Sequence, residues 1–158
     1  HSETVDTNSN KVAVVEMRNA LAQLTEKLFL VITMPNADTM GFVYRKELEL
    51  LKNQFPEQVL CVENFGKENY FSAMYYAKIL IGNTSSGIIE AASFNKYVIN
   101  LGKRQEGRIH AENVKNCDFG FNVICESIDS IKNKTWDGGN PYFNGGASEI
   151  IINTLKKL

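Results

Sequence analysis

The apolar residues of this chain gather into five short runs, and polar or charged residues dominate the stretches between them. Runs of apolar and β-branched residues are typical of strands in a parallel sheet, which is covered on both faces. The runs are residues 28–34 (LFLVITM), 58–63 (QVLCVE), 78–81 (KILI), 97–101 (YVINL) and 119–125 (FGFNVIC). We therefore expect five strands, the first four of them buried.

Helical spacing of the apolar positions predicts helices between these strands. Residues 7–10 (TNSN) offer several N-cap candidates for the first helix. Its apolar face is formed by Val14, Met17, Leu21, Leu24 and Leu28. The expected helices run from residues 7–10 to about 27, over 41–53 and 68–77, from 88 to 92, and over 127–134 and 147–158, with a Gly/Asn-rich loop at 135–146.

Strands and helices that alternate with short connections predict an α/β fold, here a single domain over residues 1–158. Right-handed crossovers then give a doubly wound, Rossmann-like parallel sheet of about five to six strands. Ligands bind beyond the carboxyl ends of the strands in such sheets. The connections that leave those ends are residues 35–39, 64–66, 82–87 and 102–108.

Composition and charge narrow the classes of partner. With 158 residues, 44% of them hydrophobic, the chain fits one globular domain, and its net charge of −1 lacks the basic footprint of a nucleic-acid-binding protein. Residues 96–115 hold five Lys/Arg against two Glu, a local excess of three positive charges. This excess indicates a small acidic ligand, although a solvated loop with spare charge would look the same.

The remaining features exclude several kinds of site. The three cysteines form no C-x-x-C pair, and neither a metal-ligand cluster nor a Ser-His-Asp or Cys-His arrangement stands out. Because no apolar stretch reaches the length of a membrane span and no signal peptide is visible, we expect a cytoplasmic protein without membrane partners. The first residue is His1 and not Met, so we expect a fragment of a longer protein.

The connection at residues 82–87 (GNTSSG) carries the most specific chemistry. It joins an apolar run to a helix start, where the first backbone N–H groups point outward and favour an anion. Thr84, Ser85 and Ser86 add hydroxyl donors for phosphate oxygens, and Gly87 permits close approach. Neither a dinucleotide fingerprint nor a P-loop is present. The turn therefore predicts a diphosphate site, with ordinary N-capping by Thr or Ser as the alternative.

Two further groups fit a nucleotide at this turn. Glu90 lies one turn inside the helix, where a carboxylate can accept both ribose hydroxyls. Arg104 and Arg108 follow the next strand, and a planar guanidinium suits a diphosphate. We expect one arginine to neutralise the ligand and the other to form a structural salt bridge. The aromatic residues of 68–77 fit a core better than a base-stacking platform.

The long stretch at residues 81–108, IGNTSSGIIEAASFNKYVINLGKRQEGR, resembles the signature of hydrolysing UDP-N-acetylglucosamine 2-epimerases. The likeness extends to HSETVD at residues 1–6, to PNAD at 35–38 and to the Gly-rich loop at 138–146. It implies the C-terminal half of a two-domain glycosyltransferase-B fold, with the N-terminal Rossmann domain missing. It also implies a homo-oligomer when the protein is full length.

The resemblance also implies roles for single residues. Thr84 and Ser85 would bind the diphosphate of UDP or UDP-N-acetylglucosamine together with Arg104, and Glu90 would hold the ribose. The remaining roles fall on residues near the base, the sugar and the glycosidic phosphate. Tyr70 and Phe65 would border the uracil, Asn36 would approach the nucleotide or sugar, and His1 would take part in catalysis near the glycosidic phosphate.

The reaction implied is elimination of UDP to a 2-acetamidoglucal, followed by hydration to N-acetylmannosamine. It needs no metal and no cofactor, and its acid/base carboxylates would belong to the missing half. Four alternatives stay open: a non-hydrolysing epimerase, a relative acting on GDP-linked or diacetamido sugars, a glycosyltransferase-B domain with a sugar acceptor, and a non-enzymatic binding module.

Overall fold

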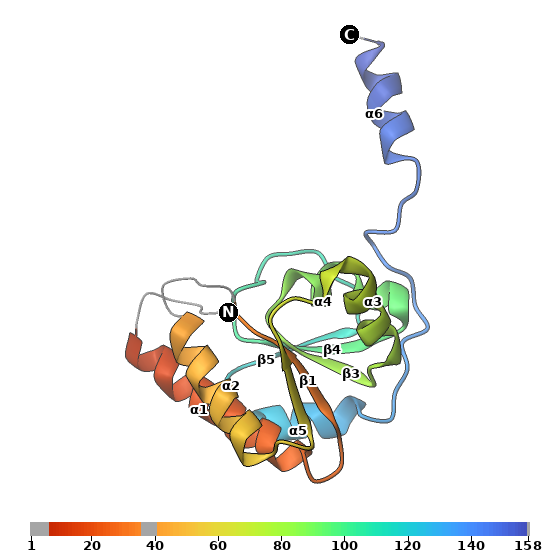
Figure 1. The fold of residues 1–158 in the computed structure, drawn as a ribbon. Helices are drawn as coiled ribbons and strands as arrows, with labels where there is room; N and C mark the ends of the chain where they lie inside the picture. Colours follow the sequence, from red (N-terminus) through yellow and green to blue (C-terminus); the bar gives the residue numbers. More distant parts are fainter. Residues whose placement is uncertain (1–6, 36–40, 158) are drawn as a thin grey trace.

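The computed structural model describes residues 7–35 and 41–157, in which helices alternate with short parallel strands (Figure 1). The first half contains α1 (Thr7–Leu24), β1 (Leu30–Thr33), α2 (Gly41–Gln54), β2 (Val59–Val62), α3 (Gly66–Tyr76) and β3 (Ile79–Gly82). The second half contains α4 (Ser85–Ile89), the 3₁₀ helix η1 (Ala91–Phe94), β4 (Tyr97–Leu101), β5 (Val114–Cys117), α5 (Phe121–Ile131) and α6 (Ala147–Leu155).

All strand pairs in the described residues are parallel, and the predicted α/β class is confirmed. The strands form two hydrogen-bonded groups, β1–β2 and β3–β4–β5, so the described part holds five strands. β1 and β3 are not hydrogen-bonded to each other but line the two sides of one groove. The chain leaves β1 toward β2 and β3 toward β4, which makes this groove the point where the strand order reverses.

Both faces of the second group are covered, as expected for a doubly wound domain. Ile99 and Leu101 of β4 pack against Ala20 of α1 and against Ile124 and Ile128 of α5. Val98, the residue before Ile99, faces Met74 of α3, Ile88 of α4 and Ala91 of η1. Because successive side chains of a strand point to opposite faces, β4 joins the two helical layers, which Figure 1 shows on either side of the strands.

The fifth strand was predicted at the wrong place. Residues 121–131 form helix α5, and the strand is β5, Val114–Cys117 (VKNC). Ile124, Ile128 and Ile131 are buried at positions i, i+4 and i+7 of the helix, a spacing that a seven-residue apolar window does not reveal. β5 escaped notice because Lys115 and Asn116 interrupt its apolar character, as an edge strand paired only with β4 allows.

The first two strands are also less buried than predicted. Val31 of β1 is 46% exposed and Leu60 of β2 is 42% exposed, because in each strand alternate side chains face away from the helices. The other face of β1 and β2 packs against α1 and α2 through residues such as Leu21, Leu48 and Leu51. The apolar runs therefore locate these two strands correctly, but they predict more burial than the strands have.

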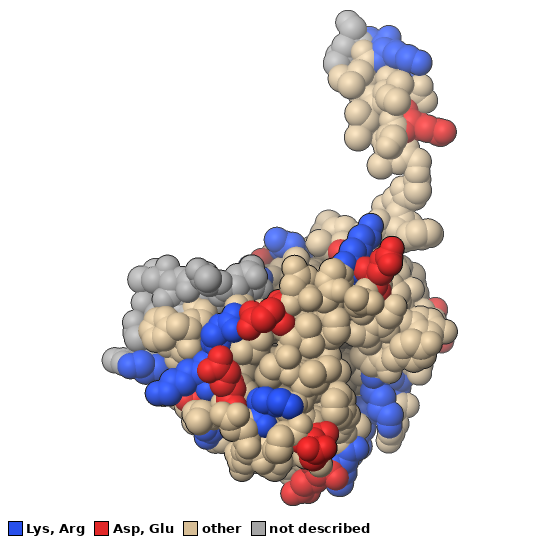
Figure 2. Space-filling view, viewed as in Figure 1, with Lys and Arg blue, Asp and Glu red and all other residues tan. Residues whose placement is uncertain are grey.

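Helix α6 stands away from the rest of the molecule (Figure 1). Each of its residues is exposed, and the polar loop before it leads away from the strands. On the face in Figure 2, Lys and Arg interleave with Asp and Glu, without a large patch of one sign. No helix among the described residues is long and apolar enough to cross a membrane.

Candidate functional site

The turn after β3 brings three hydroxyl groups together. Thr84 is the N-cap of α4 by position, yet its side chain makes no capping hydrogen bond. Its Oγ1 lies 3.4 Å from Oγ of Ser86, and the Ser86 hydroxyl is hydrogen-bonded to the hydroxyl of Tyr70 from α3. The alternative role predicted for this turn was N-capping. The Thr84 hydroxyl does not cap α4.

The loop after β4 is tied to the same turn by two hydrogen bonds. The guanidinium of Arg104 donates from Nη1 to the carbonyl oxygen of Asn83 at 2.9 Å. The side-chain amide of Gln105 donates from Nε2 to that same oxygen at 2.7 Å. Asn83 and Gln105 are both buried. The carbonyl oxygen of Asn83, the residue before Thr84, therefore holds the positive charge of Arg104 at the turn that carries these hydroxyls.

Glu90 lies at the junction between α4 and η1, where its backbone has φ −101° and ψ −32°. One carboxylate oxygen, Oε2, is buried and has no hydrogen-bond partner among the described residues. Burial raises the pKa of the Glu90 carboxyl above its ordinary value, and a hydrogen bond with the Glu90 backbone lowers it by less. A hydroxyl group would supply the donor that this carboxylate lacks.

Gly87 has a packing reason as well as the predicted one. A Cβ at this position would lie 3.0 Å from Cγ1 of Val98 in β4. Glycine therefore allows α4 to lie close to the strand, which sets the depth of Ser85 and Ser86 at the sheet edge. The sequence predicted close approach to a ligand, and the structure adds close approach of helix to strand.

Helix α4 has only five residues before the chain changes to a 3₁₀ turn. A macrodipole sums over aligned peptide units, so the field of this helix is small. An anion at this turn would thus be attracted by the Arg104 charge and by hydroxyl and N–H donors, and less by the helix than the sequence suggested.

One cavity adjoins the turn, and a second lies beside the loop after β4. The larger, of about 610 Å³, is the groove between β1 and β3, which reaches Pro35 on one side and Asn83 and Thr84 on the other. It lies where the strand order reverses, the usual position of a ligand in an open α/β sheet. Most of its lining is apolar, and its polar residues include Thr33, Asn83 and Thr84 near the ends of β1 and β3 and Tyr76 and Lys78 just before β3.

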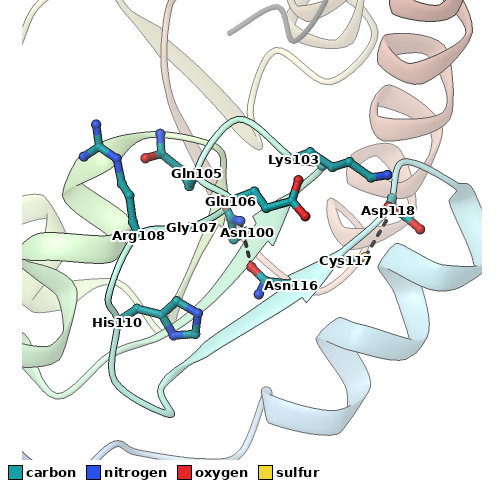
Figure 3. A pocket seen from close by; sticks show the side chains of 11 residues that line it. Asn100, Lys103, Gln105, Glu106, Gly107, Arg108, His110, Asn116, Cys117 and Asp118 are labelled. Atoms are coloured by element: carbon teal, nitrogen blue, oxygen red, sulfur yellow. Dashed lines mark hydrogen bonds between the residues drawn. The ribbon is translucent and has the colours of Figure 1, made fainter.

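The smaller cavity, of about 310 Å³, lies beyond the ends of β4 and β5 (Figure 3). The amide of Asn100 donates to Oδ1 of Asn116 across it at 2.8 Å. Figure 3 shows Gln105 and Arg108 on one side of the loop and Lys103 and Glu106 on the other. The loop thus ties Arg104 and Gln105 to the turn after β3, and Gln105 also lines this polar pocket together with its neighbours Lys103, Glu106 and Arg108.

The chain matches the family described as UDP-N-acetylglucosamine 2-epimerase over residues 1–156. It belongs to this family. The resemblance seen in residues 81–108 is thereby confirmed at the level of the family.

Named relatives are similar over most of this chain. A UDP-N,N'-diacetylbacillosamine 2-epimerase (hydrolyzing) of Legionella pneumophila is 30% identical over 138 residues, 87% of this chain and 36% of the relative. A GDP/UDP-N,N'-diacetylbacillosamine 2-epimerase (hydrolyzing) of Campylobacter jejuni is 32% identical over 105 residues, 66% of this chain and 27% of the relative. The chain spans about two fifths or less of the relatives it matches.

A solved structure shares the fold. The S. aureus MnaA–UDP co-structure aligns with a TM-score of 0.71 and 19% identity, over 92% of this chain and 40% of that one. At this identity the likeness shows the fold alone. This member of the 2-epimerase family therefore has the architecture that the sequence predicted.

Several of the predicted site residues lie together in this epimerase-family chain. Tyr70, Thr84 and Ser86 share hydrogen-bond contacts, and Arg104 reaches the same turn through Asn83. Ser85 opens α4 beside them. His1 and Asn36 lie outside the described residues. Phe65 is the N-cap of α3 and makes no side-chain capping bond, and no described contact links it to the turn.

Sequence reasoning gave no role to Gln105 or to the hydroxyl of Tyr70. Gln105 was part of the quoted signature, but an amide between charged residues carries no signal of burial, and only the fold shows it 4% exposed. Tyr70 was assigned to the base through its ring, whereas its hydroxyl contacts Ser86 and its body packs near Met74 and Ile88. No group of three metal-ligating side chains occurs within 7–35 and 41–157.

Proposed function

We propose that this chain is the nucleotide-binding part of a hydrolysing 2-epimerase that converts UDP-N-acetylglucosamine and water to N-acetylmannosamine and UDP. The observation that carries the proposal is the pair of hydrogen bonds from Arg104 and Gln105 to the Asn83 carbonyl, which fixes a positive charge beside the hydroxyls of Thr84 and Ser86. Membership of the 2-epimerase family supports it. The MnaA–UDP structure, which shares the fold, supports UDP as the nucleotide.

In the proposed binding mode the diphosphate lies at the start of α4. Thr84, Ser85 and Ser86 donate to its oxygens, and Arg104 balances its charge. The ionised carboxylate of Glu90 accepts the ribose hydroxyls, which gives its buried oxygen a donor. The nucleoside then extends toward Phe65 and Tyr70.

In the proposed reaction, a base removes the proton from C2 of the sugar while the bond from C1 to the UDP oxygen breaks. Negative charge develops on the departing diphosphate, where Arg104 and the hydroxyl donors stabilise it. Water then adds its oxygen to C1 of the glucal and a proton to the opposite face of C2. The acid/base groups for these proton transfers come from outside residues 7–157, with His1 as this chain's candidate near the glycosidic phosphate.

Calorimetry with UDP, GDP and UMP tests the binding mode. We expect the chain to bind UDP more tightly than UMP, and Arg104→Ala to weaken UDP binding about tenfold or more, because a charge-assisted hydrogen bond contributes about 1.5–3 kcal/mol. Arg108→Ala is the matched control, since Arg108 lines the smaller cavity instead, and it should change UDP affinity less than about threefold. Absence of UDP binding at millimolar concentration would refute the proposal.

A second candidate differs only in the nucleotide sugar. The relatives from Legionella and Campylobacter are described as acting on diacetylbacillosamine nucleotides, which favours a diacetamido sugar carried by UDP or GDP. Tighter binding of GDP than of UDP would favour the GDP-linked substrate. For the whole protein, release of free UDP from UDP-N-acetylglucosamine separates a hydrolysing enzyme from one that returns UDP-N-acetylmannosamine.

A further inference from the structure

Residues 136–142 form a strap across the outside of η1, the element that follows Glu90. At one end the Trp136 backbone N–H donates to the carbonyl of Asn95 at 3.2 Å. At the other end the Tyr142 hydroxyl donates to the carbonyl of Ile109, beyond the arginine loop, at 2.8 Å. The Trp136 ring meets Tyr97 edge-on, with ring centroids 6.1 Å apart. The strap thus links the end of η1, before β4, with the segment that follows Arg104 and Arg108.

Asn140 is the residue of the strap that contacts the junction between α4 and η1, where Glu90 lies. Its side-chain nitrogen donates to the carbonyl of Ile89 at 2.8 Å and to Oγ of Ser93 at 2.7 Å. Its side-chain oxygen accepts the Tyr142 backbone N–H at 2.9 Å. Every polar atom of this amide is therefore used, and its two acceptors lie on either side of Glu90 in the chain.

The junction depends on such contacts because its own helices are short. Helix α4 has five residues and η1 has four. Glu90 lies between them, as the C-cap of α4 and the N-cap of η1. Helices of this length are not stable by themselves, so tertiary contacts must set the angle at which they meet. Hydrogen bonds from one amide to both sides of the junction fix that angle.

We propose that Asn140 is a positioning residue that orients the carboxylate of Glu90 toward the ribose of the nucleotide. The inference rests on the proposed function, because it takes nucleotide binding at Glu90 as given. Asn140 acts through the backbone of Ile89 and the side chain of Ser93, without touching the nucleotide.

The test compares UDP with 2',3'-dideoxy-UDP, which lacks both ribose hydroxyls that Glu90 would accept. Calorimetry on the 158-residue chain should show that the wild type prefers UDP. Asn140→Ala should weaken UDP binding about threefold to tenfold while it changes 2',3'-dideoxy-UDP binding less than twofold, as expected for one or two net hydrogen bonds. A general destabilisation of the fold would weaken the binding of both nucleotides equally. The ratio of the two affinities therefore isolates the positioning role.

Two more variants sharpen the comparison. Asn140→Asp keeps the oxygen that accepts from Tyr142 but cannot donate to Ile89, and it should lower the ratio as Asn140→Ala does. Its added charge repels both nucleotides alike and cancels in the ratio. Asn144→Ala is the matched control, because Asn144 donates only within the loop, to the carbonyl of Pro141 at 3.1 Å, and it should leave the ratio unchanged.

Hydrogen exchange checks the contact without any ligand. In Asn140→Ala the Glu90 and Ser93 amides, which donate to Ser86 and Glu90, should exchange faster, while the Gly102 amide, which donates to Cys117, should not change. If the wild type binds UDP and the affinity ratio is unchanged in both Asn140 variants, the role of Asn140 is overturned while the proposed function stands. A wild type that binds neither nucleotide would overturn the proposed function, and the inference with it.

Discussion

At the scale of single residues, Glu90 has a carboxyl group that the fold by itself disfavours in its charged form. Burial raises its pKa, so the folded chain holds this proton more tightly than the unfolded chain. The stabilisation that the proton brings is complete below the unfolded pKa, about 4.3, and is lost as the pH rises through the higher folded value. Ionised Glu90 therefore costs stability at neutral pH.

Glu90→Gln removes this cost. We expect its Tm to exceed that of the wild type by more at pH 7 than at pH 4, as measured by circular dichroism across that range. UDP binding should weaken in the same variant, because a neutral amide is a poorer acceptor for ribose hydroxyls. Glu57→Gln, at an exposed glutamate, is the control and should show neither effect. A Tm difference independent of pH would contradict the burial argument.

Most of the described site could be anticipated residue by residue, since hydroxyls, a carboxylate and an arginine have chemistry that a short motif displays. The relations among them could not. That Arg104 and Gln105 share the Asn83 carbonyl depends on how two strands place their loops, and no spacing in the sequence encodes it. Asn140 lies 51 residues from Ile89, and in the sequence it is one asparagine in a Gly/Asn-rich loop.

At the scale of elements, apolar runs located four of the five described strands, and the error at the fifth has a clear cause. FGFNVIC places apolar residues close enough for a strand, and the buried face of α5 emerges only when Ile128 and Ile131 are included. β5 lies at the edge of its group, where polar residues such as Lys115 are tolerated. The length of the pattern explains why α5 was taken for a strand, and the polar residues of β5 explain why that strand was missed.

The contact of α4 with β4 gives a prediction at this scale. Gly87→Ala would place a Cβ 3.0 Å from Cγ1 of the buried Val98, so the Val98 side chain or the helix must give by a few tenths of an ångström. We expect a loss of about 1–3 kcal/mol in the free energy of unfolding, as for other overpacked cores, measured by urea denaturation. Gly139→Ala, where no atom lies within 4 Å of the added Cβ, is the matched control and should cost much less.

At the scale of the whole molecule, the described chain has one well-covered sheet group and one that is covered mainly on one face. The groove between β1 and β3 separates them, and the turn at Asn83 and Thr84 lies at one end of it. Because the chain spans only part of its relatives, a second domain and a homo-oligomer stay predictions.

Helix α6 tests which parts of the molecule fold as one unit. Its apolar residues Ile150, Ile151, Ile152 and Leu155 are 50–64% exposed, whereas Ile128 in α5 is 2% exposed. Ile128→Ala should therefore lower the free energy of unfolding by about 2–5 kcal/mol, as a core truncation does. Ile151→Ala removes the same atoms from a side chain that buries little surface, and it should change that free energy by less than about 0.5 kcal/mol.

Urea denaturation of the 158-residue chain measures both variants against the wild type under the same conditions. A large loss in Ile128→Ala beside a negligible one in Ile151→Ala would place the cooperative unit in the strands and the helices packed on them, with α6 outside it. A loss above about 1 kcal/mol in Ile151→Ala would contradict this, because only a side chain that packs in solution can cost that much when it is truncated.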